Sequence, residues 1–177
     1  TTESMLRHFI ETVGGRSFIF KPRIMVCIPF GVTTVEKRAV LEAAVQAGAR
    51  KTYLIEEPLA AALGAGLDIS EPYGAMVVDI GGGTTDVAVI SLGGIVASES
   101  LRIGGDKFDD AIMRYVKKEY NMMIGERTAE EIKMNIGTAI RGRREGSMEV
   151  RGRDLLSGLP KTVRMSAVET GEALNEP

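Results

Sequence analysis

A glycine-rich turn between two apolar runs constrains this chain more than any other feature. Residues 76–91 read MVVDIGGGTTDVAVIS, and both apolar runs have the β-branched composition of strands. The three glycines can adopt backbone conformations closed to other residues, so their N–H groups can line a concavity for an anion. The turn therefore predicts a phosphate-binding loop, and the alternative is an ordinary glycine-rich hairpin turn. The candidate phosphate ligands are Gly81, Gly82, Gly83, Thr84 and Thr85.

An aspartate stands at the point where the first strand gives way to this turn. Asp79 supplies a hard carboxylate oxygen, the kind of ligand that Mg²⁺ prefers, and Mg²⁺ commonly keeps several of its waters. We therefore expect Asp79 to hold Mg²⁺ through water.

The composition is that of a globular protein with a real core, since 44% of the 177 residues are hydrophobic and 26% are charged. The chain carries 22 Lys and Arg against 24 acidic residues, so no basic field recruits nucleic acid. Cys27 stands alone in an apolar run and predicts a small buried hydrophobe in a reducing cytoplasm. No apolar run approaches the roughly 20 residues of a membrane-spanning helix.

The first part of the chain alternates helical and strand patterns. A capping box at residues 33–36 opens a helix that stops at Gly48, and a proline fits the first turn of a later helix. This rhythm predicts a parallel sheet with helical crossovers. The expected elements are helices over residues 4–13, 33–47 and 58–64 and strands over 23–28 and 52–55.

A turn-rich stretch over residues 71–74 predicts a boundary, after which a strand meander begins. A second capping box, from Thr128 to Glu131, predicts the start of a helix. The expected elements are strands over residues 75–80, 86–91, 95–103, 148–151 and 162–165 and helices over 106–120, 128–139 and 167–174.

Four segments resemble the MreB family of bacterial rod-shape-determining actin homologues. They stand in the family's order and spacing, and the likeness covers nearly the whole chain. A glycine loop alone is a weak signal, whereas four ordered motifs are specific. The segments are DIGGGTTD (79–86), LIEEPLAAA (54–62), RIGGD (102–106) and IGERTAE (124–130).

The resemblance implies an α/β, actin-like (ribonuclease-H-like) fold of two lobes with ATP and Mg²⁺ between them. It implies an incomplete fold, because the chain reads as an internal fragment. The family's first phosphate loop and the later segment that closes over adenosine are absent from this sequence, so we expect the chain alone to bind ATP weakly or not at all. The implied subdomains are IA (part, 1–73), IIA (start, 74–105), IIB (106–166) and a helix returning to IIA (167–177).

The resemblance also assigns roles to single residues. Glu57 matches the carboxylate that positions the attacking water, with Thr84 as a second anchor; the alternative is an acid favoured by the helix dipole. Glu130 and Lys133 are expected to reach the ribose and adenine, although an i, i+3 pair is more often a solvated helix face. The expected nucleoside contacts are Glu130, Glu131, Ile132 and Lys133. Departures from a common family form at Asp86 and Asn135 leave the choice of ATP or GTP open.

A loop with three large apolar residues, Phe18, Ile19 and Phe20, is flanked by Arg16, Lys21 and Arg23. Apolar residues beside positive charges favour an anionic bilayer surface, and the resemblance places a membrane-inserting loop here. The alternative is that both phenylalanines point into the core. The implied location is the cytoplasm, at the periphery of the inner face of the cell membrane.

These observations predict a fragment of a polymerising, membrane-associated ATPase that maintains rod shape by organising cell-wall synthesis. The implied partners are further copies of the protein, the inner membrane surface and membrane proteins of cell-wall elongation, and no nucleic acid. The alternatives are a non-polymerising ATPase of the same fold, such as a chaperone ATPase or sugar kinase, and a purely structural interaction module.

Overall fold

The computed structural model describes residues 2–14, 21–140 and 142–177, and the chain divides into two compact units. Unit 1 comprises Thr1–Asp79 and Asp86–Ser100, and unit 2 comprises Ile80–Thr85 and Leu101–Pro177. This division falls at other residues than the boundary predicted over 71–74. The assignment of the four residue ranges to the family's subdomains IA, IIA and IIB stays a prediction.

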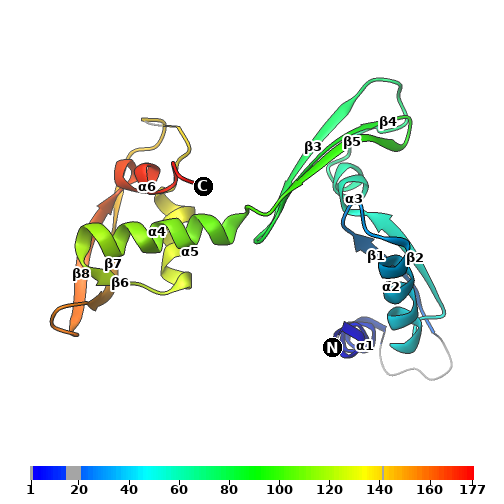
Figure 1. Ribbon diagram of the computed structural model, residues 1–177, viewed down its shortest axis with the longest axis horizontal. Helices are drawn as coiled ribbons and strands as arrows, with labels where there is room; N and C mark the ends of the chain where they lie inside the picture. Colours follow the sequence, from blue (N-terminus) through cyan, green and yellow to red (C-terminus); the bar gives the residue numbers. More distant parts are fainter. Residues whose placement is uncertain (1, 15–20, 141) are drawn as a thin grey trace. The chain divides into compact units, whose positions relative to one another are not determined.

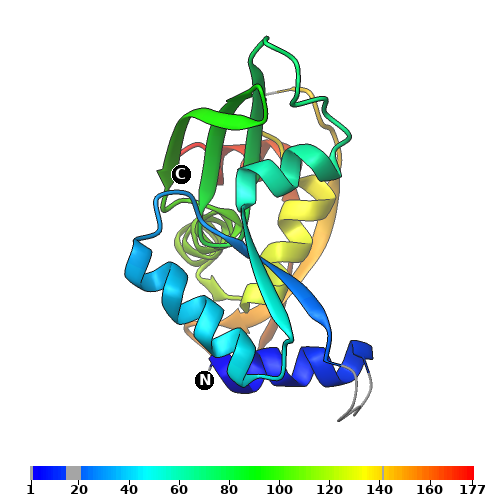
Figure 2. The same cartoon turned by 90° about the vertical axis from the view of Figure 1, so that its right-hand side faces the viewer.

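Unit 1 begins with alternating helices and strands, as predicted. The strands β1 and β2 pair in parallel, because the helix α2 between them gives the chain room to cross over. Helix α2 begins at the predicted capping box, in which Thr33 and Glu36 each accept a hydrogen bond from the other's backbone N–H. It packs beside β2 (Figure 2). The elements are α1 (Thr2–Gly14), β1 (Arg23–Ile28), α2 (Thr34–Gln46), β2 (Lys51–Glu56) and α3 (Glu57–Gly64).

Strand β1 has one covered face and one open face. Side chains alternate between the two faces of a strand, and along β1 Met25 and Cys27 lie on the exposed side. The prediction that Cys27 is buried is therefore wrong. An uninterrupted apolar run indicated a strand covered on both faces, whereas the described residues cover this one on a single side.

The other sheet of unit 1 has the strand order β3-β4-β5, which is the order of the predicted meander. Its strands are β3 (Ala75–Ile80), β4 (Thr85–Ser91) and β5 (Gly94–Leu101). A two-residue turn with positive φ at both Leu92 and Gly93 joins β4 to β5, as in a type I′ hairpin. Along β4 every second residue is buried, so Asp86 points to the same side as Ala88 and Ile90.

Unit 2 is a three-stranded antiparallel sheet, ordered β6-β7-β8, packed with three helices (Figure 1). Its core joins residues from every element, among them Ile112, Met122, Ile132, Val150 and Met165, all fully buried or nearly so. The elements are α4 (Gly105–Tyr120), β6 (Met122–Met123), α5 (Glu126–Ile136), β7 (Ser147–Asp154), β8 (Pro160–Ser166) and α6 (Ala167–Ala173).

Helix α5 starts earlier than the sequence predicts. Its N-cap is Gly125 and no side chain caps it, so the predicted capping box from Thr128 to Glu131 is wrong. The burial of Ala129, Ile132 and Ile136 against the core sets the phase and extent of this helix. A capping box does open α6, where Ser166 and Glu169 bond each other's backbone N–H.

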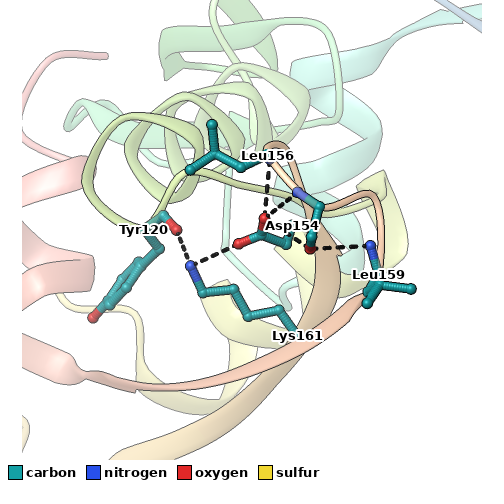
Figure 3. Close-up of polar contacts among 6 residues, drawn as sticks. Tyr120, Asp154, Leu156, Leu159 and Lys161 are labelled. Carbon is teal, nitrogen blue, oxygen red and sulfur yellow. Dashed lines mark hydrogen bonds and ion pairs between the residues drawn. The ribbon is translucent and has the colours of Figure 1, made fainter.

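The turn between β7 and β8 is held by Asp154 (Figure 3). Its Oδ1 accepts hydrogen bonds from the N–H groups of Leu156 and Ser157, both at 2.9 Å, and Oδ2 lies 3.1 Å from Lys161 Nζ. These bonds favour the ionised carboxylate and lower the pKa of Asp154 to about 2, the backbone bond from Ser157 contributing most. The same lysine donates to Tyr120 O at 2.7 Å, which ties the hairpin to the end of α4.

Candidate functional site

The glycine loop lies against the N-terminal end of α4, within unit 2. The carbonyl oxygens of Gly81 and Gly82 accept hydrogen bonds from the N–H groups of Gly105 and Asp106, both at 2.9 Å. The C=O and N–H of a trans peptide point in opposite directions, so the N–H groups of Gly82 and Gly83 point away from α4. The loop thus offers backbone donors on its free side, which suits a phosphate oxygen.

The glycines of the loop do not adopt the glycine-only backbone conformations that were predicted. Gly81, Gly82 and Gly83 all lack a positive φ, so the loop does not depend on glycine-only backbone conformations. The backbone instead approaches the loop most closely at Gly104, the N-cap of α4, which lies outside the loop. A Cβ at this position would lie 2.5 Å from Gly82 O and 2.6 Å from Gly81 O. A residue with a side chain at position 104 would therefore push the loop off the helix.

The two threonines of the loop are placed differently. Thr85 Oγ1 donates to Ile103 O at 2.7 Å, so the hydroxyl proton expected for a phosphate ties β4 to the segment before α4. Thr84 O accepts from Gly81 N at 2.9 Å and closes the turn, while the residue itself is exposed. Of the two, Thr84 keeps the more accessible hydroxyl.

A pocket of about 650 Å³ lies beside the first turns of α4 and α5. Its volume falls within the roughly 300 to 1,000 Å³ typical of small-molecule sites. Glu130, an expected nucleoside contact, lines it. Glu131 is exposed and pairs with Arg127, and Ile132 is fully buried in the core, so these two side chains do not line the pocket. The lining residues are Asp106, Asp109, Asp110, Met113, Glu126, Arg127 and Glu130.

Lys133, the remaining expected nucleoside contact, bridges α5 and α4. Its Nζ lies 2.9 Å from Asp109 Oδ2 and 3.2 Å from Gly105 O. Asp109 Oδ1 is buried and has no hydrogen-bond partner in the described part of the chain. The lysine therefore adjoins the helix end that supports the glycine loop, and its ammonium group already bonds to protein oxygens.

Two aspartates of unit 1 act on the carboxyl group of Glu57. Burial, then the negative charges of Asp86 and Asp79, raise the pKa of Glu57 above its ordinary value. Glu57 opens α3, Asp79 lies near the end of β3 and Asp86 lies near the start of β4. A carboxylate whose pKa is raised in this way is a candidate for handling a proton or a water.

The magnesium and membrane predictions are not tested by this geometry. No group of three or more His, Cys, Asp or Glu in the described ranges is arranged to hold a metal ion. A Mg²⁺ ion bound to Asp79 through water needs no such group, and this role stays a prediction. Phe18, Ile19 and Phe20 lie outside the described residues. Among the helices in the described ranges, none has the length and hydropathy to cross a bilayer.

Sequence reasoning assigned no role to Gly104 or Asp109. Gly104 was visible as one of two glycines just before a predicted helix, a pattern typical of anion sites at helix N-termini. The pairing of Asp109 with Lys133 had no such signal, because 24 residues separate them and only the packing of α4 on α5 brings them together.

Comparison with known proteins gives consistent matches. The family model described as MreB/Mbl protein matches residues 1–177. The cell shape-determining protein MreB of Escherichia coli K12 is 56% identical over 177 residues, which are 99% of this chain and 51% of that protein. The cell shape-determining protein Mbl of Bacillus subtilis 168 is 50% identical over 175 residues, 99% of this chain and 53% of that protein. The chain thus spans about half the length of these curated relatives.

Solved structures agree with these matches. MreB5 of Spiroplasma citri bound to ADP has a TM-score of 0.89 and 40% identity, covering 98% of this chain and 52% of that one. The same protein bound to AMPPNP has a TM-score of 0.87. A MamK double helical filament, at 20% identity and a TM-score of 0.73, shares the fold. The predicted fold class, an incomplete actin-like α/β fold, is confirmed.

Proposed function

The chain belongs to the MreB/Mbl protein family, and we propose that it is the part of a polymerising actin-like ATPase that holds one phosphate loop and one wall of the nucleoside pocket. The observation that carries this proposal is the glycine loop seated on the N-terminal end of α4, in the same unit as a pocket lined by Glu130. The description of MreB5 with AMPPNP and with ADP supports a nucleotide as the ligand.

The residues of the chain divide the work of the site. ATP supplies the phosphoryl group when bound, and Mg²⁺ offsets its charge. The N–H groups of Gly82 and Gly83 and the hydroxyl of Thr84 bind phosphate oxygens, and Asp79 holds the cation through water. Glu57 orients the attacking water. Phosphoryl transfer depends mainly on such placement and on charge neutralisation.

We propose further that the whole protein forms filaments and that these attach to the inner face of the cell membrane. A heterologous contact that does not close propagates as a filament. Phe18, Ile19 and Phe20 would each contribute weakly to lipid binding, and a filament would repeat them along its length, which gives avidity. Membrane proteins of cell-wall elongation are the further partners that the family resemblance suggests.

The test is sedimentation of the full-length protein with and without ATP, together with ATP affinity. The variant Gly82→Val should lose ATP binding, because a Cβ at residue 82 lies 3.1 Å from Asp106 Oδ1 and the methyl groups of valine extend further. Gly64→Val is the matched control, since a Cβ there has nothing within 4 Å. Wild-type affinity in Gly82→Val would refute the loop assignment. ATP binding without any sedimenting polymer would favour the non-polymerising ATPase.

A further inference from the structure

The ion pair between Lys133 and Asp109 is partly buried. The two side chains are 21% and 14% exposed, and the charged atoms lie 2.9 Å apart. By comparison, Arg127 and Glu131 on the same helix are 92% and 53% exposed. Exposed pairs of that kind contribute little, whereas a pair shielded from water is harder to break without leaving an unpaired charge.

A chain of hydrogen bonds connects this pair to the glycine loop. Lys133 Nζ donates to Gly105 O at 3.2 Å, and the N–H of the same Gly105 donates to Gly81 O at 2.9 Å. The space around Gly105 is also limited, because a Cβ there would lie 3.3 Å from Lys133 Nζ. The ammonium group therefore lies two hydrogen bonds from the loop.

From this geometry we infer that Lys133 and Asp109 are positioning residues: their ion pair fixes the first turn of α4 and, through it, the phosphate loop. This inference rests on the proposed function, because it concerns how that same site is shaped. It adds to the role expected by family resemblance, in which Lys133 contacts adenosine directly. The ammonium group of Lys133 has three N–H donors, and its bonds to Asp109 and Gly105 O account for two of them.

The two residues depend on each other. Asp109 Oδ1 is already buried with no partner among the described residues, so loss of the lysine leaves both carboxylate oxygens uncompensated. Loss of the aspartate leaves the ammonium group with a backbone carbonyl alone. Removing both charges together avoids either penalty. The effects of the two single changes should therefore not add.

The experiment uses the full-length protein with Lys133→Met, Asp109→Asn and the double variant. Three quantities are measured: the affinity for ATP, the affinity for adenosine, and the hydrogen exchange of the amides from Gly81 to Thr84 without nucleotide. Each single variant should bind ATP on the order of tenfold more weakly, with faster loop exchange, and the double variant should be no worse than either. In Asp109→Asn the affinity for adenosine should hold, because this change acts on the site through the phosphate loop. Lys118→Met is the control, since Lys118 is 81% exposed and pairs with Glu119 in the last turn of α4.

Other outcomes separate the possible failures. One outcome would contradict the inference: Lys133→Met weakens ATP and adenosine binding equally, while Asp109→Asn changes neither affinity nor loop exchange. Lys133 would then only contact the nucleoside, and the ion pair would not position the loop. If the wild-type protein binds no ATP, the proposed function fails. The hydrogen exchange of the loop amides still tests whether the ion pair of Lys133 and Asp109 positions the loop. Should a single variant not fold, Lys133→Arg keeps the cation and must restore both wild-type loop exchange and wild-type ATP affinity. A failure of that rescue also overturns the inference.

Discussion

The substitution Gly104→Ala probes the seat of the phosphate loop directly. A Cβ at residue 104 would lie 2.5 Å from Gly82 O and 2.6 Å from Gly81 O, and Cβ atoms essentially never come within 3.0 Å of a heavy atom beyond their own residue and its chain neighbours. The loop must therefore move by at least about half an ångström. Gly104 has an extended backbone, φ −157°, which alanine also adopts, so the effect is steric rather than conformational.

The expected loss follows from the bonds that this movement stretches. Two hydrogen bonds of 2.9 Å join the loop to the N–H groups of Gly105 and Asp106. Each contributes about 0.5 to 1.5 kcal/mol, so their loss costs about 1 to 3 kcal/mol. If this cost falls on the binding-competent loop, ATP affinity drops by about 5- to 150-fold.

The assay is ATP titration of the full-length protein, with hydrogen exchange of the loop amides as a second measurement. Gly64→Ala is the control, because a Cβ at the end of α3 has nothing within 4 Å and alanine is the better helix former. Wild-type affinity and unchanged loop exchange in Gly104→Ala would refute the argument that this glycine is required for close packing.

Three further predictions test the other parts of the chain. Glu57→Gln should keep ATP binding and slow hydrolysis about a hundredfold or more, and a wild-type hydrolysis rate would contradict the role. The raised pKa of Glu57 means that its charged form destabilises the fold as pH rises above about 4.5. The melting temperature of the variant at pH 7 should therefore not fall. Asp154→Asn should lower the melting temperature at pH 7 but not near pH 2. The lowered pKa of Asp154 means that its carboxylate stabilises the fold above pH 3.8, and that stabilisation is lost as pH falls toward 2. A difference in melting temperature that does not depend on pH would exclude this role of the carboxylate. Phe18→Ser with Ile19→Gly should spare sedimenting filaments and reduce their binding to anionic liposomes. Each large apolar side chain that leaves water contributes about 1.5 to 3 kcal/mol to the free energy of lipid binding. Undiminished lipid binding by intact filaments would rule out this loop as the anchor.

Several elements were predictable because their signals are local. The capping box at Thr33 and Glu36 acts across three residues, and it begins α2 as expected. The glycine loop, the parallel pairing of β1 with β2 and the strand order β3-β4-β5 likewise follow from turn residues, apolar runs and connection lengths. The order and spacing of the motifs were sufficient to identify the family from the sequence alone.

The predictions that were wrong depended on which face of a strand or helix another element covers. The apolar run around Cys27 suggested a buried thiol, yet strand alternation places it on the open face of β1. The box at Thr128 was compatible with an N-cap, but packing of Ala129 and Ile132 into the core draws the helix start back to Gly125. A local pattern permits a cap or a buried face, and only packing decides whether it is used.

The sequence by itself determined where a glycine loop suited to phosphate lies along the chain, because glycine content and strand patterns act over a few residues. Tertiary structure alone decided what holds that loop. Gly104 lets the loop lie close against α4, and Lys133 and Asp109, 24 residues apart, form an ion pair beside that helix end. Such contacts join residues with no shared local pattern, since they form only when α4 packs on α5 and the glycine loop folds back onto the end of α4.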